Sequence, residues 1–107
     1  MTKQRRFDLE YAPIVRGHLQ AIDPKYYSLI RKTLEQQLQF EPDVKTQNRE
    51  PLKRPVDFGA QWELRLGLDN QFRVFYKINH EMKRVIILAI GEKRGDRLII
   101  GGEVVRL

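Results

Sequence analysis

The stretch that decides the fold is residues 62–91, WELRLGLDNQFRVFYKINHEMKRVIILAIG. Apolar and polar side chains alternate in its first two segments, at 62–66 and 72–78, and this period of two is typical of half-buried strands. Residues 85–90 are apolar throughout, as in a strand that is covered on both faces. Turn-forming residues separate the three segments, which therefore predict an antiparallel sheet.

The two faces of this sheet are expected to differ in chemistry. One face is apolar and needs a cover, whereas Arg65, Arg73 and Lys77 gather around Phe75 on the other. Arginine binds phosphate in bidentate fashion and stays charged, so this second face predicts an anion-binding surface. Phe75 and Trp62 would offer rings on which unstacked bases could stack.

Such a face suits RNA cleavage by attack of a ribose 2′-hydroxyl on the adjacent phosphate. The reaction needs a base for the hydroxyl proton, cations for the phosphate oxygens and an acid for the leaving oxygen. Glu50 and Glu63 are the nearby carboxylates. The alternative is that Arg65 and Lys77 pair with Glu63 across the strands while the aromatic side chains simply pack.

The N-terminal part of the chain predicts a strand and two helices. Residues 5–11 alternate as a strand does, and residues 15–22 carry the apolar stripe of a helix, with His18 as a packed, hydrogen-bonded side chain. Residues 23–24, Asp-Pro, are a strong helix start, and this second helix should end near Gln39. The two helices form a hairpin that would cover the apolar face of the sheet.

The expected fold class is α+β, with an N-terminal strand and a two-helix hairpin packed on a twisted antiparallel sheet of about four strands. Residues 1–107 are expected to form one domain. Residues 42–61 read as an irregular loop, and loops of this length are usually functional or disordered. Beyond the sheet, residues 95–96 predict a turn, residues 98–100 a short extended segment, and residues 104–105 a return onto the core.

Composition narrows the function classes. The formal net charge of +6 favours phosphate backbones or an acidic protein as partner. There is no cysteine and there are only two histidines, without metal-ligand spacing, so we expect no disulfide, no metal site and no cofactor. No signal peptide and no apolar run of membrane-spanning length is visible, which predicts a soluble, cytoplasmic protein without membrane contact.

Five motifs in one order carry a family resemblance. They are NREPL (48–52), WELRL (62–66), FRVFY (72–76), ILAIG (87–91) and LIIGGEV (98–104). Together they resemble the RelE/ParE family of toxins from prokaryotic type II toxin–antitoxin modules. The resemblance implies a RelE-like fold of a helix hairpin on a twisted antiparallel sheet, and a cognate antitoxin protein that wraps the toxin.

The resemblance also implies roles for individual residues. Arg73 falls on the phosphate-binding arginine of the family, and Arg65 lies where RelE-like nucleases carry a basic residue. Glu50 resembles the glutamate that serves as general base in the YoeB branch. Lys93 and Arg94 fall just after the last core strand, where active members place arginine, histidine or tyrosine for acid and stacking roles.

Two departures from the family pattern concern the acid. No histidine or tyrosine follows His80, and Glu63 lies where the RelE branch proper has a lysine. Lys93 would have to act as the acid instead. The expected catalytic residues are Glu50, Arg65, Arg73 and Lys93, and the expected substrate-binding residues are Lys53, Lys77, Arg94 and Arg97.

Three functions follow from the resemblance. RelE-like members cleave mRNA in the ribosomal A site without a metal ion, which makes the ribosome and mRNA the expected partners. ParE-like members inhibit DNA gyrase through a protein contact. A module that has lost toxicity and only binds its antitoxin is the third possibility. The first is the expected function, an mRNA endonuclease that inhibits translation.

Overall fold

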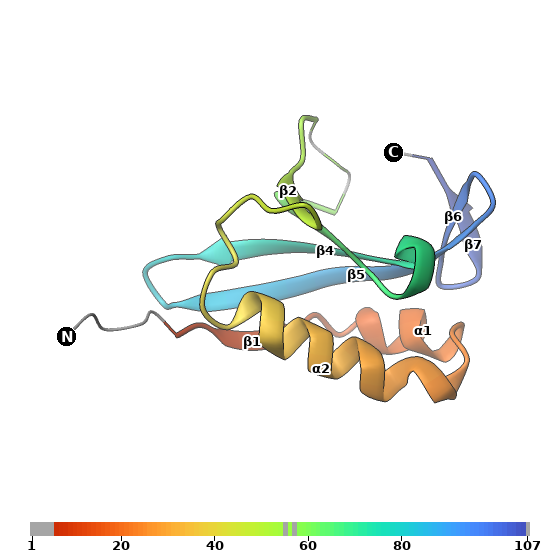
Figure 1. Ribbon diagram of the computed structural model, residues 1–107, viewed down its shortest axis with the longest axis horizontal. Coiled ribbons are helices and arrows are strands. Elements are labelled where there is room, and N and C mark those ends of the chain that lie inside the picture. Colours follow the sequence, from red (N-terminus) through yellow and green to blue (C-terminus); the bar gives the residue numbers. More distant parts are fainter. Residues whose placement is uncertain (1–5, 55, 57, 107) are drawn as a thin grey trace.

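The computed structural model describes residues 6–54, 56 and 58–106, so Arg5 and Pro55, which the sequence assigns to the first strand and to the long loop, lie outside the described residues. The described strands are β1 (Asp8–Tyr11), β2 (Arg49–Pro51), β3 (Trp62–Leu66), β4 (Phe72–Asn79), β5 (Arg84–Arg94), β6 (Arg97–Ile100) and β7 (Glu103–Val105). The helical elements are α1 (Val15–Gln20), the 3₁₀ turn η1 (Pro24–Tyr26), α2 (Tyr27–Leu38) and the 3₁₀ turn η2 (Leu68–Asn70). The α+β class is confirmed (Figure 1).

The strands form one sheet in the order β2-β3-β4-β5-β6-β7, with β1 added to β5. Strand β5 pairs with β4 along one edge, and along its other edge first with β1, in parallel, and then with β6, antiparallel. Between these two partners, the Ile90 N–H donates to Nδ1 of His18 at 3.3 Å. A side chain of α1 thus completes the edge of β5 where its partner changes, and the packed, hydrogen-bonded histidine is confirmed.

The helices cover one face of the sheet (Figure 1). Helix α2 turns the fully buried Ile30, Leu34 and Leu38 towards it. The Asp23 side chain accepts the backbone N–H of Lys25, which is the predicted cap. Both helices are shorter than predicted: α1 ends at Gln20, and the second helix starts as the 3₁₀ turn η1 and becomes α-helical only at Tyr27. No helix in the described part of the chain is long and apolar enough to cross a membrane.

The sequence underestimated the sheet, which has seven described strands where about four were predicted. Strands β2 and β7 have only three residues each, too few for a period of two to show in the sequence. Strand β2 also ends in Pro51, which a strand tolerates at the edge of a sheet because the missing N–H faces away from the ladder.

Strand β5 does not end near Gly91 but continues to Arg94. Gly91 is needed there because β6 passes very close. A Cβ atom on Gly91 would lie 2.8 Å from Cγ1 of Ile100 and 2.9 Å from the carbonyl oxygen of Ile99. Since side chains alternate along the extended strand, Lys93 and Arg94 leave β5 on opposite faces.

The sheet face opposite the helices, here called the outer face, carries a small apolar cluster of its own. Phe75 is its centre and is fully buried beneath side chains of the 42–61 loop and of β6. Trp62 lies on the helix side and stacks on Tyr76 with ring centroids 6.2 Å apart. The expectation that Phe75 and Trp62 offer stacking surfaces for bases on one face is therefore wrong. Val104, expected on the core, is 53% exposed.

The close approach at Gly91 generates a stability prediction. Gly91→Ala is expected to lower the free energy of unfolding by about 1–3 kcal/mol, because the added methyl group must displace β6. Gly17→Ala in α1 is the matched control, since nothing lies within 4 Å of the position of its Cβ, and its stability should be unchanged or raised. Urea denaturation measures both. A Gly91→Ala protein as stable as the wild type would show that β6 is not held this closely.

His18 generates a pH prediction. Burial lowers the pKa of His18 below its ordinary 6.5. Between the lowered value and 6.5 the unfolded state binds more protons than the folded state, so the stabilising contribution is present above 6.5 and is lost as the pH falls below it. We expect the free energy of unfolding to drop on acidification through this window. His18→Gln should flatten that part of the pH profile; an identical profile in both proteins would contradict the assignment.

Candidate anion-binding site

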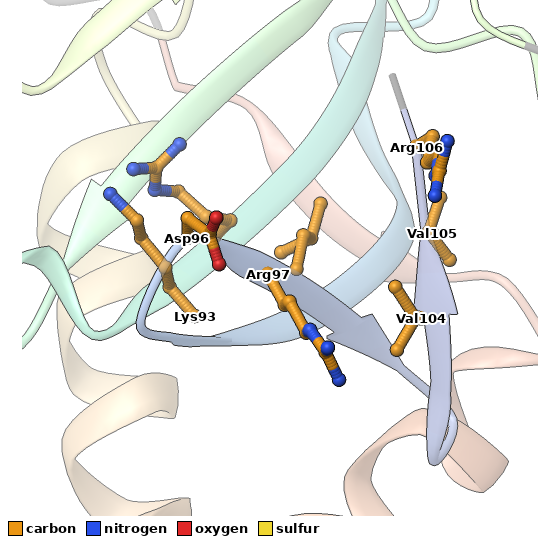
Figure 2. A pocket seen from close by; sticks show the side chains of 8 residues that line it. Lys93, Asp96, Arg97, Val104, Val105 and Arg106 are labelled. Atoms are coloured by element: carbon orange, nitrogen blue, oxygen red, sulfur yellow. The ribbon is translucent and has the colours of Figure 1, made fainter.

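A pocket of about 800 Å³ opens between the C-terminal end of β5 and the β6–β7 hairpin (Figure 2). Its lining residues are Arg73, Lys93, Asp96, Arg97, Leu98, Val104, Val105 and Arg106. Four of these side chains are cationic and one is a carboxylate, which leaves a net charge of +3 at neutral pH. A concave surface with this excess of positive charge is suited to bind an anion.

The fold brings this pocket together from three places. Arg73 on β4 lies opposite Gly91 on β5, and Lys93 follows two residues later on the same face. Asp96 sits in the turn between β5 and β6. Figure 2 shows Lys93 and Asp96 on the β5 side of the pocket and Arg106 on the β7 side. The hairpin therefore forms one wall of the site and β4 with β5 the other.

Beside the pocket, two arginines and two glutamates form a row of ion pairs across β2, β3 and β4. Arg65 contacts Glu50 at 3.0 Å and Glu63 at 3.5 Å, and Arg73 contacts the other oxygen of Glu63 at 3.4 Å. Arg65 and Arg73 are direct cross-strand neighbours, an arrangement that like charges disfavour. The buried Glu63 carboxylate between them offsets that repulsion and fixes both guanidinium groups.

This ion-pair row changes the expected electrostatics of the outer face. The predicted pairing of Arg65 with Glu63 is present, whereas Lys77 has no ion pair within the described part of the chain. Arg73 alone belongs both to the row and to the pocket. Its Nε is buried without a hydrogen-bond partner among the described residues. The arginine charge over the middle of the sheet is therefore balanced by carboxylates, whereas Lys77 keeps a charge there that no described residue pairs.

The other cations of the pocket keep their charge. Across residues 6–54, 56 and 58–106, neither Lys93, Arg97 nor Arg106 takes part in an ion pair, and all three are exposed. No described ion pair therefore cancels their charges, and Asp96 offsets only one of them in the net charge of the pocket. Three unpaired cations at one pocket keep its positive potential open to an incoming anion.

The sequence-predicted site residues fall into three groups. Arg73, Lys93 and Arg97 line the pocket, and Glu50 and Arg65 are joined to it through Glu63. The side chains of Lys53 and Lys77 are exposed outside the pocket. Arg94 projects from the opposite face of β5 and contacts Glu92 at 3.3 Å. The structure thus assembles part of the predicted set and separates the rest.

Sequence reasoning missed Asp96 and Arg106 as site residues. A usable signal was present, because two glycines at 101–102 between the apolar runs LII and EVV are typical of a β-hairpin. A hairpin at that point returns residue 106 to the neighbourhood of Arg97. Arg49 lies within the predicted 42–61 loop, yet it is buried and its guanidinium donates to the carbonyls of Gln37 and Glu41.

Comparison of the sequence with protein-family models and with curated proteins finds no match. The fold, by contrast, is shared with solved structures. A chain of the toxin–antitoxin complex RelBE2 from Mycobacterium tuberculosis aligns with a TM-score of 0.68 and 20% identity over 87% of this chain and 98% of its own. A chain of the archaeal RelE–RelB complex from Pyrococcus horikoshii gives 0.56 and 24% over 84% and 97%. The α+β fold is that of these toxin–antitoxin proteins.

The ion-pair row generates a stability prediction. Glu63→Gln should lower the free energy of unfolding by about 1.5–3 kcal/mol, because two neighbouring guanidinium groups lose the carboxylate that holds them. Glu35→Gln is the matched control. Its ion pair with Arg31 spans 3.8 Å on the exposed side of α2, so a change within about 0.5 kcal/mol is expected. Equal effects of the two substitutions in urea denaturation would refute a structural role for Glu63.

Proposed function

We propose that this protein is the toxin of a type II toxin–antitoxin module and that it cleaves mRNA on the ribosome without a metal ion. The observation that carries the proposal is a cationic pocket in which Arg73, fixed by Glu63, meets Lys93 and Arg97. This pocket lies on a fold shared with chains of two RelE-containing toxin–antitoxin complexes.

The proposed chemistry is attack of a ribose 2′-oxygen on the adjacent phosphorus, which forms a 2′,3′-cyclic phosphate and releases the 5′-oxygen. Glu50 is the proposed base for the 2′-hydroxyl proton, and its side chain is 37% exposed although it pairs with Arg65. Arg65 and Arg73 would neutralise the charge that develops on the phosphate oxygens. Lys93, an ammonium group in the pocket, is the proposed proton donor to the leaving 5′-oxygen.

The proposed partners follow from the same surface. Both matched structures are complexes of a toxin with an antitoxin. We expect a cognate antitoxin with acidic residues to cover the pocket, because burying several unpaired cations without counter-charges would be costly. An antitoxin seated there would exclude RNA from the same residues.

A second function is favoured by one feature. Arg65 and Arg73 are both tied to carboxylates, and neither histidine nor tyrosine occurs among the described lining residues. A site of this kind binds anions more readily than it transfers protons. The alternatives are a ParE-like toxin that inhibits DNA gyrase through a protein contact, or a module that only binds its antitoxin.

The deciding experiment adds the purified protein to translating ribosomes and maps mRNA ends by primer extension. We expect cuts in phase with the codons, reduced by about 10²–10³-fold in Arg73→Ala, because a preorganised cation is lost from the phosphate. Arg31→Ala on the exposed side of α2 is the control and should cut as the wild type does. Intact mRNA together with inhibited gyrase supercoiling would establish the alternative and reject the nuclease.

A further inference from the structure

His18 joins the helical layer to the β6–β7 hairpin at two points. Its Nδ1 accepts the backbone N–H of Ile90 at 3.3 Å, directly before Gly91, where β5 begins to pair with β6. A Cβ on Gly101 would lie 3.3 Å from Cδ2 of the imidazole, so the turn of the hairpin packs against the same ring. These two interactions together are called the His18 contact below.

The His18 contact requires a neutral imidazole. A ring nitrogen that accepts a hydrogen bond carries no proton, whereas both nitrogens of a protonated imidazole are donors. A proton on Nδ1 would therefore face the N–H of Ile90 and leave that backbone donor without its acceptor. His18 is partly buried, and burial lowers its pKa below the ordinary 6.5. The closed contact and the proton thus exclude each other.

The other titratable groups on the elements around His18 are engaged or exposed. They are Tyr11 on β1, Arg16 on α1, Tyr27 and Arg31 on α2, Glu92 on β5 and Glu103 on β7. Gln71 and Arg94 both donate to Glu92, and Arg31 pairs with Glu35. The Tyr27 hydroxyl donates to a backbone carbonyl of α1, and Tyr11, Arg16 and Glu103 are exposed. Among the described residues, burial is the cause of the lowered pKa of His18.

The β6–β7 hairpin forms one wall of the anion pocket and contributes Arg97 and Arg106 to it (Figure 2). It is attached through its pairing with the end of β5, through the packing of Leu98 and Ile100 in the apolar cluster of the outer face, and through the His18 contact. Of these attachments, only the His18 contact depends on a group that titrates near neutral pH. Its loss frees the end of the hairpin that carries the turn.

We propose that protonation of His18 releases the β6–β7 hairpin from the helical layer and thereby weakens anion binding in the pocket. The two walls of the pocket then no longer face each other at a fixed distance. A positive charge added near a cationic pocket would by itself strengthen anion binding, so release of the hairpin predicts the opposite sign. The effect concerns the pocket alone and holds whatever reaction the site supports.

Release of the hairpin is tested by amide hydrogen exchange, followed by NMR between about pH 7.5 and about pH 5. Opening takes up a proton, so the log of the opening constant of the hairpin amides should rise as the pH falls below 6.5, with a slope that approaches about −1. The hairpin amides should also be less protected than those of β3 and β4 at every pH, which separates this local opening from global unfolding.

The chain has two histidines, and the second one supplies the matched control. His80 is exposed in the turn between β4 and β5, so His80→Gln should keep the slope. His18→Gln should abolish it, because an amide oxygen can accept the N–H of Ile90 at any pH. If His18→Gln does not fold, the wild-type slope and the His80→Gln control decide the question without it.

The consequence for the pocket is tested with sulfate, which keeps both negative charges over this pH range. Wild-type protein should bind sulfate at least about 2-fold more weakly at about pH 5 than at about pH 7.5, as expected when half of the hairpins are open and only the closed form binds. His18→Gln should lose this weakening, and its own pH dependence gives the contribution of the remaining groups, Asp96 among them. Chemical shifts of the hairpin amides report the binding.

Three results would overturn the inference. They are hairpin amides as protected as those of β3 and β4, an exchange slope that is equal in wild type and His18→Gln, and wild-type sulfate binding that is unchanged or stronger at low pH. The outcome is separable from that of the ribosome assay, which runs at one pH. Codon-phased cleavage with a pH-independent hairpin would reject the His18 device alone, whereas intact mRNA with a pH-dependent hairpin would reject the nuclease alone.

Discussion

The fold depends on strand β5, because one of its edges pairs first with β1 and then with β6. One edge of this eleven-residue strand pairs with β4 from Arg84 to Glu92, but the other edge passes from β1 to β6. A buried strand edge cannot leave a backbone N–H unpaired without a cost of about 1–3 kcal/mol, and the Ile90 N–H lies in the gap. His18 fills it from the helical layer. A Cβ on Gly101 would lie 3.3 Å from the same imidazole ring, so the turn of the β6–β7 hairpin also packs there. One histidine thus ties together β5, α1 and the hairpin.

The pocket exists because of this arrangement. Strand β6 pairs with the last four residues of β5, Gly91 to Arg94, and its Leu98 and Ile100 pack against the apolar cluster of Phe75 on the outer face. The hairpin thereby lines the pocket together with Arg73 and Lys93. The apolar cluster around Phe75 shields the outer face of the sheet from water, as the helices shield the other face. It covers the middle of the sheet, and the pocket opens beside the C-terminal end of β5.

Periodic segments were predictable from the sequence, and short or exceptional ones were not. Helix α2 and strands β3 and β4 show their period over at least five residues, so their existence and buried faces could be predicted. Gly91 was misleading, because glycine usually weakens a strand, whereas here it permits the close approach of β6. The position of Arg73 on a strand could be predicted from the alternating segment 72–78. Its link to Glu63 could not, since that depends on the register of two strands and on which carboxylates the fold buries.

The ion-pair row explains why a chain with a net charge of +6 need not be uniformly basic on its outer face. Glu50 and Glu63 balance Arg65 and Arg73 there, and the buried charge of Glu63 is tolerable because it has partners. Glu63 therefore compensates positive charge on the outer face and also holds Arg73 at the edge of the pocket. The conformational entropy of the Arg73 side chain is therefore lost when the chain folds and not when a ligand binds. An anion that enters the pocket meets the guanidinium of Arg73, which Glu63 holds in place, on one side and the unpaired cations of the hairpin on the other. Because one side is fixed and the other is free to adjust, we expect the anion to be oriented by Arg73.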